Sequence, residues 1–354
     1  MSNILFFDPA CQRPYDTQTL RQQALGGTEA SCVRVADALG ALVMQHNRER
    51  PCGRYLPPDK IAGIEHVVIL RDARVLPQLR RQFPQARFHF WVHDQLRPGS
   101  SRARRLRATA AVLHELAVKV ICVSDTQRRM VEATLGSLGI GDKVRATTIY
   151  NPVEVAATES GVPYRDNQLV FFSSPNKGLA YTLDVFRALR RRMPEILLSV
   201  ANPGYKQTPR SLIDGVEYLG ALAQPQVHQL VRASLCTLAL NFVLPETFGL
   251  VYAESLALGT PVLAHEAGAA AEVIADSRQV LPVRRAQRVY EGLVHELPTQ
   301  WRSGPARLAD RMGLFDDCCE RIRAWRSGGR PTVGPDPRFA LETVVARWRA
   351  LLAA

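Results

Sequence analysis

Two glutamates lie eight positions apart in an otherwise apolar stretch, LPETFGLVYAESLALGTPVLA at residues 244–264. Burial of a carboxylate is costly unless the group is paired or hydrogen-bonded, so Glu246 and Glu254 need partners. The residues between them predict a helix that begins at Thr247, Phe248 and Gly249 and ends just before Gly259.

Such a helix suits a ligand that carries a diphosphate. Its first backbone amides have no partner inside the helix and form an anion site. Eight helical residues rise about 12 Å, which is roughly the reach from a ribose across a diphosphate to an attached sugar. One glutamate would then accept hydrogen bonds from sugar hydroxyls and the other from ribose hydroxyls. The alternative is one solvated glutamate on the helix face and one N-terminal capping carboxylate.

Three further positions combine chemically useful residues with the predicted end of a strand or start of a helix. Gly26 and Gly27 precede a helix and would let a ligand approach the backbone. His93 ends a buried strand, where it is either a ligand-facing residue or a structural histidine. Lys177 lies at a helix start, a place that the helix dipole disfavours for a lysine with only a surface role.

The elements that must position these residues are short strands alternating with helices, a pattern that restarts after the polar residues 151–167. This alternation predicts parallel sheets in an α/β fold. We therefore expect two Rossmann-like, doubly wound domains, residues 1–155 and 156–335, facing a cleft, with ligands at the carboxyl ends of the strands. Residues 336–354 predict an amphipathic helix. The predicted strands are 4–7, 42–45, 66–70, 88–92, 118–123, 147–149, 169–172, 196–200, 216–219, 235–240 and 261–264.

The composition is that of a globular protein, with 46% hydrophobic and 22% charged residues among 354. No apolar run is long enough to span a membrane, and the N-terminus lacks the pattern of a signal peptide. Seven cysteines without CxxC spacing indicate free thiols. These features together predict a cytoplasmic protein.

The net charge of +12 comes almost wholly from arginine. It suits phosphate-bearing ligands, nucleic acid or an anionic membrane face, although an arginine-rich coding bias would produce the same charge. Nucleic-acid binding would need aromatic platforms interleaved with arginine, and aromatic residues make up 7% of the chain, so no nucleic-acid partner is expected. The sequence does not predict the oligomeric state.

The segment of residues 97–120 contains a predicted basic amphipathic helix. Such a helix either contacts an anionic inner membrane face or packs its leucines on the domain core beneath a solvated charged face. The arginines that crowd its start are Arg102, Arg104, Arg105 and Arg107.

The setting of the two glutamates resembles the E-x7-E signature of retaining GT-B glycosyltransferases of the family 4 type. A proline precedes Glu246, Phe-Gly follows shortly after it, and Gly-Thr-Pro-Val follows Glu254. The resemblance covers most of the chain. It includes GGTEA at 26–30, WVHD at 91–94, VSDTQRR at 123–129, YNPV at 150–153, PNKG at 175–178 and GAAAEVI at 268–274.

The resemblance implies a GT-B fold and transfer of a sugar from a nucleoside diphosphate sugar, such as a GDP- or UDP-sugar, to an acceptor hydroxyl with retention. The acceptor would be a glycan or a lipid-linked molecule in bacterial polysaccharide, lipopolysaccharide or glycolipid synthesis. The first domain would bind the acceptor and the second the donor, with the C-terminal helix crossing back to the first. No cofactor or metal is implied, and the sequence has no D-x-D triplet. The alternative is a nucleotide-sugar-binding protein that has lost transferase activity.

By the same resemblance, His93 and Glu246 would contact the donor sugar, and Lys177 would stabilise the departing phosphate. Leu219 and Gly220 would cradle the nucleobase. The full donor-binding set comprises Gly26, Gly27, Ser173, Ser174, Leu219, Gly220, Thr247, Phe248, Gly249, Leu250 and Glu254.

The chain departs from the family pattern close to Lys177. Family members usually carry an arginine about five residues before this lysine, where this sequence has Phe172, Ser173 and Ser174. The serines can donate hydrogen bonds but supply no charge. Arg210 is a candidate for the missing cation, and the sequence does not decide between it and others.

Overall fold

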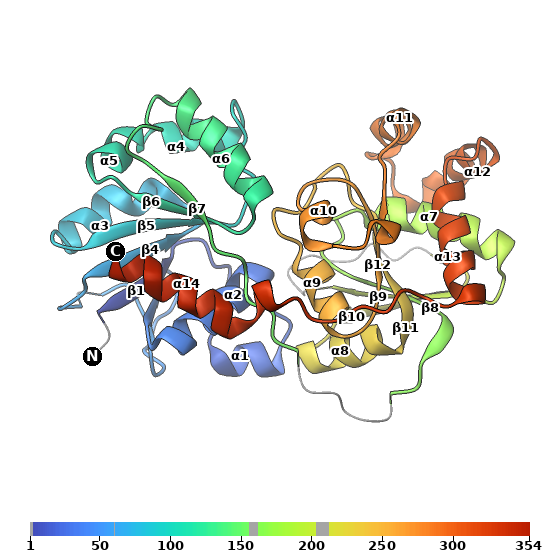
Figure 1. The fold of residues 1–354 in the computed structure, drawn as a ribbon, viewed down its shortest axis with the longest axis horizontal. Helices are drawn as coiled ribbons and strands as arrows, with labels where there is room; N and C mark the ends of the chain where they lie inside the picture. Colours follow the sequence, from blue (N-terminus) through green and yellow to red (C-terminus); the bar gives the residue numbers. More distant parts are fainter. Residues whose placement is uncertain (1–2, 60, 156–161, 203–211) are drawn as a thin grey trace. The chain divides into compact units, whose positions relative to one another are not determined.

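A computed structural model describes residues 3–59, 61–155, 162–202 and 212–354 (Figure 1). The chain forms two compact units. Unit 1 comprises Met1–Leu20, Gly27–Pro152 and Pro337–Ala354, and unit 2 comprises Arg21–Gly26 and Val153–Asp336.

Unit 1 contains a seven-stranded parallel sheet in the order β3-β2-β1-β4-β5-β6-β7. Its strands are β1 (Ile4–Asp8), β2 (Leu42–Gln45), β3 (Tyr55–Leu56), β4 (His66–Leu70), β5 (Arg87–Val92), β6 (Lys119–Cys122) and β7 (Ala146–Thr148). Its helices are α1 (Thr17–Gln22), α2 (Gly27–Leu39), η1 (Ala73–Val75), α3 (Leu76–Gln82), α4 (Ser101–Arg107), α5 (Ala110–Glu115), α6 (Asp125–Ser137), η4 (Pro337–Phe339) and α14 (Leu341–Ala353).

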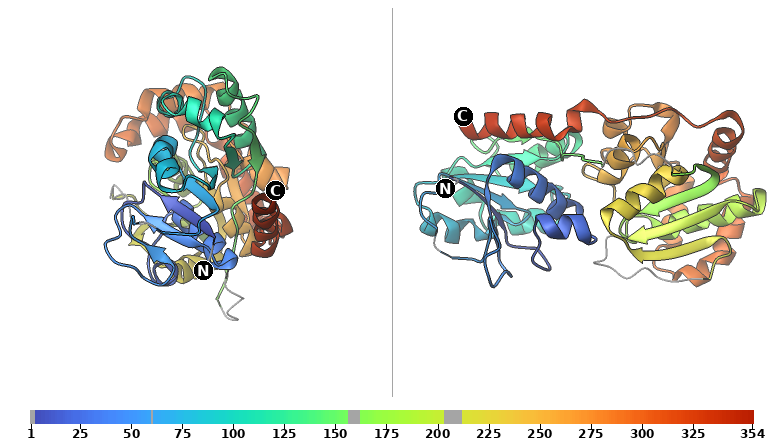
Figure 2. Two further views of the ribbon diagram at one scale, coloured as in Figure 1. Left: turned by 90° about the vertical axis from the view of Figure 1, so that its left-hand side faces the viewer. Right: turned by 90° about the horizontal axis from the view of Figure 1, so that it is seen from below.

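Side-chain alternation along the strands assigns the helices of unit 1 to the two faces of its sheet. Leu5 and Phe90 share a core with Leu106 and Leu113 of the α4–α5 segment. Successive side chains point the other way, and the ring of Trp91 meets Trp348 of α14 at 4.9 Å between centroids. The C-terminal helix therefore packs on the first sheet, as predicted; Figures 1 and 2 show it beside α2.

Unit 2 contains a six-stranded parallel sheet in the order β10-β9-β8-β11-β12-β13. Its strands are β8 (Arg165–Phe172), β9 (Leu197–Asn202), β10 (Val216–Ala221), β11 (Ser234–Ala239), β12 (Val262–His265) and β13 (Val280–Leu281). Its helices are α7 (Leu179–Arg192), α8 (Gln224–Ala233), α9 (Leu250–Ala257), α10 (Ala270–Val273), η2 (Ser277–Gln279), α11 (Arg285–Val294), η3 (Thr299–Arg302), α12 (Ser303–Arg311) and α13 (Asp316–Gly328). These two parallel α/β units confirm the predicted fold class.

The helix predicted within residues 97–120 is interrupted. The segment forms two short helices, α4 and α5, and β6 begins at Lys119. The break lies at Thr109, whose buried hydroxyl donates to the carbonyl of Leu106 at 3.1 Å and so favours a turn over a continuing helix. The apolar residues Ala103, Leu106 and Leu113 are buried in the core of unit 1. Among the described residues, no helix is long and apolar enough to cross a membrane.

Candidate active site

Lys177 and Glu246 form an ion pair at the carboxyl edge of the unit 2 sheet. Lys177 lies in the loop between β8 and α7, and Glu246 lies in the loop between β11 and α9. Because β8 and β11 are neighbours in the sheet, their following loops emerge side by side. Lys177 Nζ donates to Glu246 Oε2 at 2.9 Å, with side-chain exposures of 30% and 16%. A cation and a carboxylate are thus held together, half-open to solvent, where ligands of parallel α/β sheets bind.

Glycine allows these two loops to touch. Gly178 has a left-handed backbone (φ 87°), and a Cβ added to it would lie 3.1 Å from Asn241 Cα. Asn241 in turn shapes the loop before Glu246, because its Oδ1 accepts the Leu244 amide at 3.1 Å and its Nδ2 donates to the Leu244 carbonyl. The spacing of the two charged side chains is therefore set by backbone contacts and not by the pair itself.

The loop after β12 supports Glu246 from another side. The amide of Ala269 donates to the Glu246 carbonyl at 3.0 Å. Gly268 is left-handed (φ 61°), and a Cβ added to it would lie 2.2 Å from the same carbonyl oxygen. The backbone of the GAAAEVI motif thus contacts the backbone carbonyl of Glu246. The sequence did not predict this contact.

We expect Gly268→Ala to displace Glu246 and to destabilise the protein by about 1–3 kcal/mol, the usual cost of overpacking. Chemical denaturation with two spectroscopic probes measures this cost. The matched control is Gly136→Ala in α6, where an added Cβ meets nothing within 4 Å and should be neutral or slightly stabilising. Equal stabilities of the two variants would contradict the proposed backbone contact.

Glu254 lies on α9 and is bound by a residue that sequence reasoning missed. Gln224 Nε2, from the first residue of α8, donates to Glu254 Oε1 at 3.2 Å. Gln224 follows β10, where Gly220 is left-handed (φ 72°) and the register shifts between Tyr218 and Gly220. Glu254 is therefore connected to the strand end that holds Leu219 and Gly220, the predicted nucleobase contacts.

The predicted start of the helix between the two glutamates is wrong. The helix α9 begins at Leu250, after Gly249 with φ 89°. A Cβ at Gly249 would lie 2.3 Å from the Tyr252 ring, so the left-handed turn and the close ring require glycine before the helix. Thr247 and Phe248 consequently precede the helix. Because Glu246 is not helical, the 12 Å helical rise between the glutamates does not apply.

The serines before Lys177 have different environments. Ser174 is buried, its hydroxyl donates to Asn176 Oδ1 at 2.5 Å, and its carbonyl accepts the Lys177 amide at 2.8 Å. Ser174 therefore shapes the loop, whereas Ser173 is half-buried. The preceding Phe172 packs against the Val170, Val231 and Leu258 cluster. Arg210, the candidate replacement cation, lies outside the described residues.

His93 in unit 1 follows β5 and is buried, with 9% of its surface exposed. Its ring lies 4.4 Å from that of Trp91. Burial, and then the positive charge of Arg71, hold the pKa of His93 well below its usual range. His93 is therefore neutral near pH 7, and its predicted contact with the donor sugar would be a hydrogen bond and not a charge interaction.

The neighbouring residues of unit 1 form a charged group that sequence reasoning missed. Arg71 follows β4 with a left-handed backbone (φ 61°), which is rare for arginine. It forms two contacts of 3.1 and 3.2 Å with Glu29, in the first turn of α2, a helix that begins at Gly27. Asp94, beside His93, pairs with Arg102 at 3.2 Å. The sequence contains a signal for this charged group, because Arg71 directly follows a buried strand and Glu29 belongs to the GGTEA motif.

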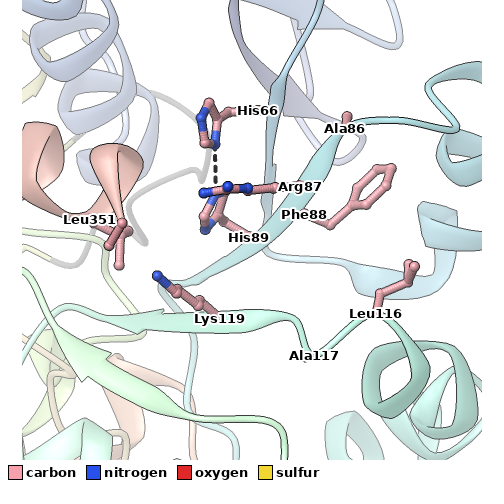
Figure 3. A pocket seen from close by; sticks show the side chains of 10 residues that line it. His66, Ala86, Arg87, Phe88, His89, Leu116, Ala117, Lys119 and Leu351 are labelled. Carbon is pink, nitrogen blue, oxygen red and sulfur yellow. Dashed lines mark hydrogen bonds between the residues drawn. The ribbon is translucent and has the colours of Figure 1, made fainter.

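Two further histidines meet at the opposite, amino-terminal edge of the unit 1 sheet. His66 Nδ1 and His89 Nε2 lie 3.2 Å apart beside a cavity of about 300 Å³ that Arg87 and Lys119 also line. Figure 3 shows Arg87 and Lys119 extending toward His89, with Leu351 of α14 on another side. Burial, with contributions from His66 and the two cations, lowers the pKa of His89 to about 3. Both histidines are thus neutral structural groups at this edge.

Buried neutral histidines predict a pH dependence of stability. Burial lowers the pKa of His265 to about 4, below its value near 6.5 in the unfolded chain. The unfolded state then binds more protons as the pH falls, so stability is lost between about pH 6.5 and 4. For His265 alone, the loss at pH 5 amounts to about 2 kcal/mol.

Denaturation between pH 8 and 5 should therefore show a flatter pH dependence for His265→Gln than for the wild type. The control His295→Gln removes an exposed histidine and should keep the wild-type slope. A wild-type slope in His265→Gln would contradict the assignment, whatever the absolute stability of that variant.

No group of three or more His, Cys, Asp or Glu side chains within the described ranges is arranged to hold a metal ion.

Comparisons with known proteins show which proteins this chain is similar to. Residues 166–296 match the family model described as Glycosyl transferases group 1. The phosphatidyl-myo-inositol mannosyltransferase of Mycolicibacterium smegmatis is 29% identical over 223 residues, or 57% of this chain and 55% of that protein. The chain thus spans about half the length of the curated relatives it matches.

Solved structures share the fold. HepE from Anabaena, in complex with UDP and glucose, has a TM-score of 0.62 at 15% identity over 99% of both chains. Sucrose-phosphate synthase from Thermosynechococcus elongatus has a TM-score of 0.57 at 15% identity, also over 99% of both. The fold is therefore that of the GT-B glycosyltransferases. The residues of unit 2 that match the model of the glycosyl transferases of group 1 include the Lys177–Glu246 pair.

Proposed function

We propose that the protein transfers a sugar from a nucleoside diphosphate sugar to an acceptor hydroxyl with retention of anomeric configuration. The observation that carries this proposal is the Lys177–Glu246 contact of 2.9 Å, a few residues before the start of α9. A sugar phosphate needs a cation at the phosphate and an acceptor of hydroxyl hydrogen bonds at the adjacent sugar. This pair offers both at one place.

In the proposed reaction, Lys177 and the amides at the start of α9 stabilise the departing diphosphate. Glu246 accepts hydrogen bonds from the sugar as it passes through an oxocarbenium-like transition state. Neutral His93 donates to or accepts from the sugar near the reacting carbon. The protein's own cations neutralise the phosphates, so we expect activity without a metal ion.

The nucleoside would bind on the side of Glu254. Its ribose hydroxyls would replace Gln224 as donors to the Glu254 carboxylate, while Leu219 and Gly220 line the base. The comparisons favour a UDP-sugar or a mannose donor such as GDP-mannose, because a structural neighbour is named with UDP and the sequence relatives are named mannosyltransferases. The relatives' name also makes a lipid-linked acceptor the first to test, beside a glycan, in bacterial envelope synthesis in the cytoplasm.

Glu254→Ala is expected to weaken nucleoside diphosphate binding roughly 10- to 100-fold, because a hydrogen bond to a charged group is worth about 1.5–3 kcal/mol. A thermal-shift panel of UDP, GDP and ADP first selects the nucleotide, and calorimetry then measures the variant. Gln224→Ala is the matched control, since it removes a hydrogen-bond donor to Glu254 but not the carboxylate. Unchanged affinity in folded Glu254→Ala would overturn the ribose assignment.

The second candidate is a nucleotide-sugar-binding protein without transferase activity. The uncharged Phe172–Ser174 segment before Lys177 favours it, because a phosphate cation expected there is missing. Hydrolysis of the selected donor sugar separates the candidates. Steady release of nucleoside diphosphate supports the transferase, and tight binding without release supports the binding protein.

A further inference from the structure

Large exposed hydrophobic residues gather on one part of unit 2. Five of them lie within 24 positions of the chain, on α11, on η3 and in and just after α12. They are Val289, Leu293, Trp301, Leu308 and Met312, with exposures of 54%, 76%, 66%, 61% and 75%. We call them, with the exposed arginines beside them, the α11–α12 surface. Single exposed hydrophobic residues are ordinary, but such a concentration marks an interaction surface.

The two helices present these residues on consistent outward faces. In α11, Arg285, Val289 and Leu293 repeat every four positions, so they lie along one side of the helix. In α12, Arg307, Leu308 and Arg311 are similarly grouped and exposed. The opposite sides are buried: Tyr290, Val294 and Ala309 belong to the core of unit 2. The exposed residues therefore face outward because the amphipathic pattern of each helix is satisfied on its other side.

The exposure of Trp301 is imposed by its buried neighbours. Arg302 is fully buried, where it donates to Asp184 and Glu291 at 2.7 Å each. The carbonyl of Thr299 accepts from Arg187 at 3.0 Å. The chain is thus tied down on both sides of Trp301, and the indole projects outward with 66% exposure. A tryptophan held this way loses little conformational entropy when it meets a partner.

The charge of the α11–α12 surface indicates what kind of partner it binds. The exposed arginines at positions 285, 288, 307 and 311 form no ion pair with any residue that the structure describes. The exposed acid on this stretch, Glu296, contacts His295 at 2.8 Å. A symmetric contact with a second copy would set these arginines against one another, which costs energy. The surface is complementary to an anionic partner.

We propose that the α11–α12 surface rests on an anionic lipid bilayer, with Trp301, Leu293 and Leu308 in the interface and the arginines at the headgroups. Tryptophan is enriched at membrane interfaces, and arginine stems lie along apolar surface while the charges reach the phosphates. Stable attachment takes two signals, apolar contact and charge. Figure 1 shows α11 and α12 on the face of unit 2 that carries α7 and α13.

The arginine cluster of unit 1 provides a contrast. Arg102, Arg104, Arg105 and Arg107 are exposed on α4, but the apolar residues Ala103 and Leu106 beside them are buried. That cluster offers charge without apolar surface. We therefore expect it to contribute less than the α11–α12 surface to membrane binding, in contrast to what the sequence pattern of residues 97–120 suggested.

The full chain should co-sediment with vesicles of phosphatidylcholine and phosphatidylglycerol and not with phosphatidylcholine alone. Arg307→Gln with Arg311→Gln should weaken binding roughly fivefold per arginine removed, and Trp301→Ser with Leu308→Ser should weaken it at least as much. The matched control is Arg104→Gln with Arg105→Gln on α4, which should weaken binding less than Arg307→Gln with Arg311→Gln. Because the proposal uses none of the donor-site residues, nucleoside diphosphate affinity should be unchanged in every variant, which also shows that each one is folded.

Equal binding to both kinds of vesicle, or wild-type binding by the Trp301/Leu308 variant, would overturn the proposal. A wild-type dimer in solution that the Trp301/Leu308 variant loses would instead assign the surface to self-association. Failure of the donor-hydrolysis assay with intact vesicle binding would overturn the proposed function and leave this inference standing.

Discussion

Lys177→Ala is expected to reduce sugar transfer roughly 100- to 1,000-fold, since removal of one charge contact to a developing anion costs a few kcal/mol. The loss should be large because Phe172, Ser173 and Ser174 supply no second cation on the same loop. Initial rates with the selected donor, in the presence of acceptor or as hydrolysis, measure it. Folding should be nearly unaffected, because the lysine side chain is 30% exposed.

The control for loss of charge is Lys143→Ala, at an exposed position in unit 1, which should keep wild-type activity. A second variant tests whether a cation at another position of the same loop can replace Lys177. Phe172 packs against Val170 and Val231, so an arginine at residue 172 would disturb the core. Ser173 is the better site for Ser173→Arg, which should restore part of the activity of Lys177→Ala.

If Lys177→Ala keeps more than about a tenth of wild-type turnover, equivalent to about 1.4 kcal/mol of barrier, another residue supplies the phosphate charge. Arg210→Ala is then the next variant, because the sequence makes Arg210 a candidate for the missing cation. A large loss in Arg210→Ala combined with a small loss in Lys177→Ala would exchange the roles of the two residues.

Most strands were predictable from the sequence because they are short apolar runs in a parallel sheet, although β7 and β10 are only partly buried. The runs His66–Leu70 and Leu42–Gln45 match the predicted ranges. The strands β3 and β13 were missed, since each has two residues and no periodic pattern. The start of α9 was misplaced because Gly249 was assigned to the helix, whereas its left-handed backbone depends on the Tyr252 ring.

The site was predictable as a set of residue types and not as a set of contacts. Lys177 and Glu246 are separated by 69 positions, and they meet because β8 and β11 are adjacent in a sheet whose strand order is not sequential. The bond between Gln224 and Glu254 likewise depends on packing of α8 beside α9. No pattern within one segment contains this information. The roles of the donor-binding and catalytic residues remain predictions.

Glu246→Ala is expected to leave nucleoside diphosphate affinity within about twofold while lowering turnover roughly 10- to 100-fold, the effect of about 1.5–3 kcal/mol from a lost charged hydrogen bond. The physical reason is the proposed role of the Glu246 carboxylate at the donor sugar, whereas Glu254 is proposed to bind the ribose. Calorimetry with the nucleotide and rates with the donor sugar measure the two effects separately. Glu246→Gln is the conservative variant, which keeps an oxygen acceptor but removes the charge.

The ion pair leads to a further expectation for nucleotide affinity, because the removal of Glu246 leaves Lys177 without this charge partner. Without Glu246, the Lys177 ammonium loses a partner at 2.9 Å and is free to bind phosphate more closely. Nucleotide affinity should therefore stay constant or rise slightly, while it falls in Glu254→Ala. A double-mutant cycle of Lys177→Ala and Glu246→Ala should give a turnover loss smaller than the sum of the single losses, since residues in contact do not act independently. If nucleotide affinity falls in Glu246→Ala as far as in Glu254→Ala, both glutamates serve the nucleoside, and the division between sugar and ribose is wrong.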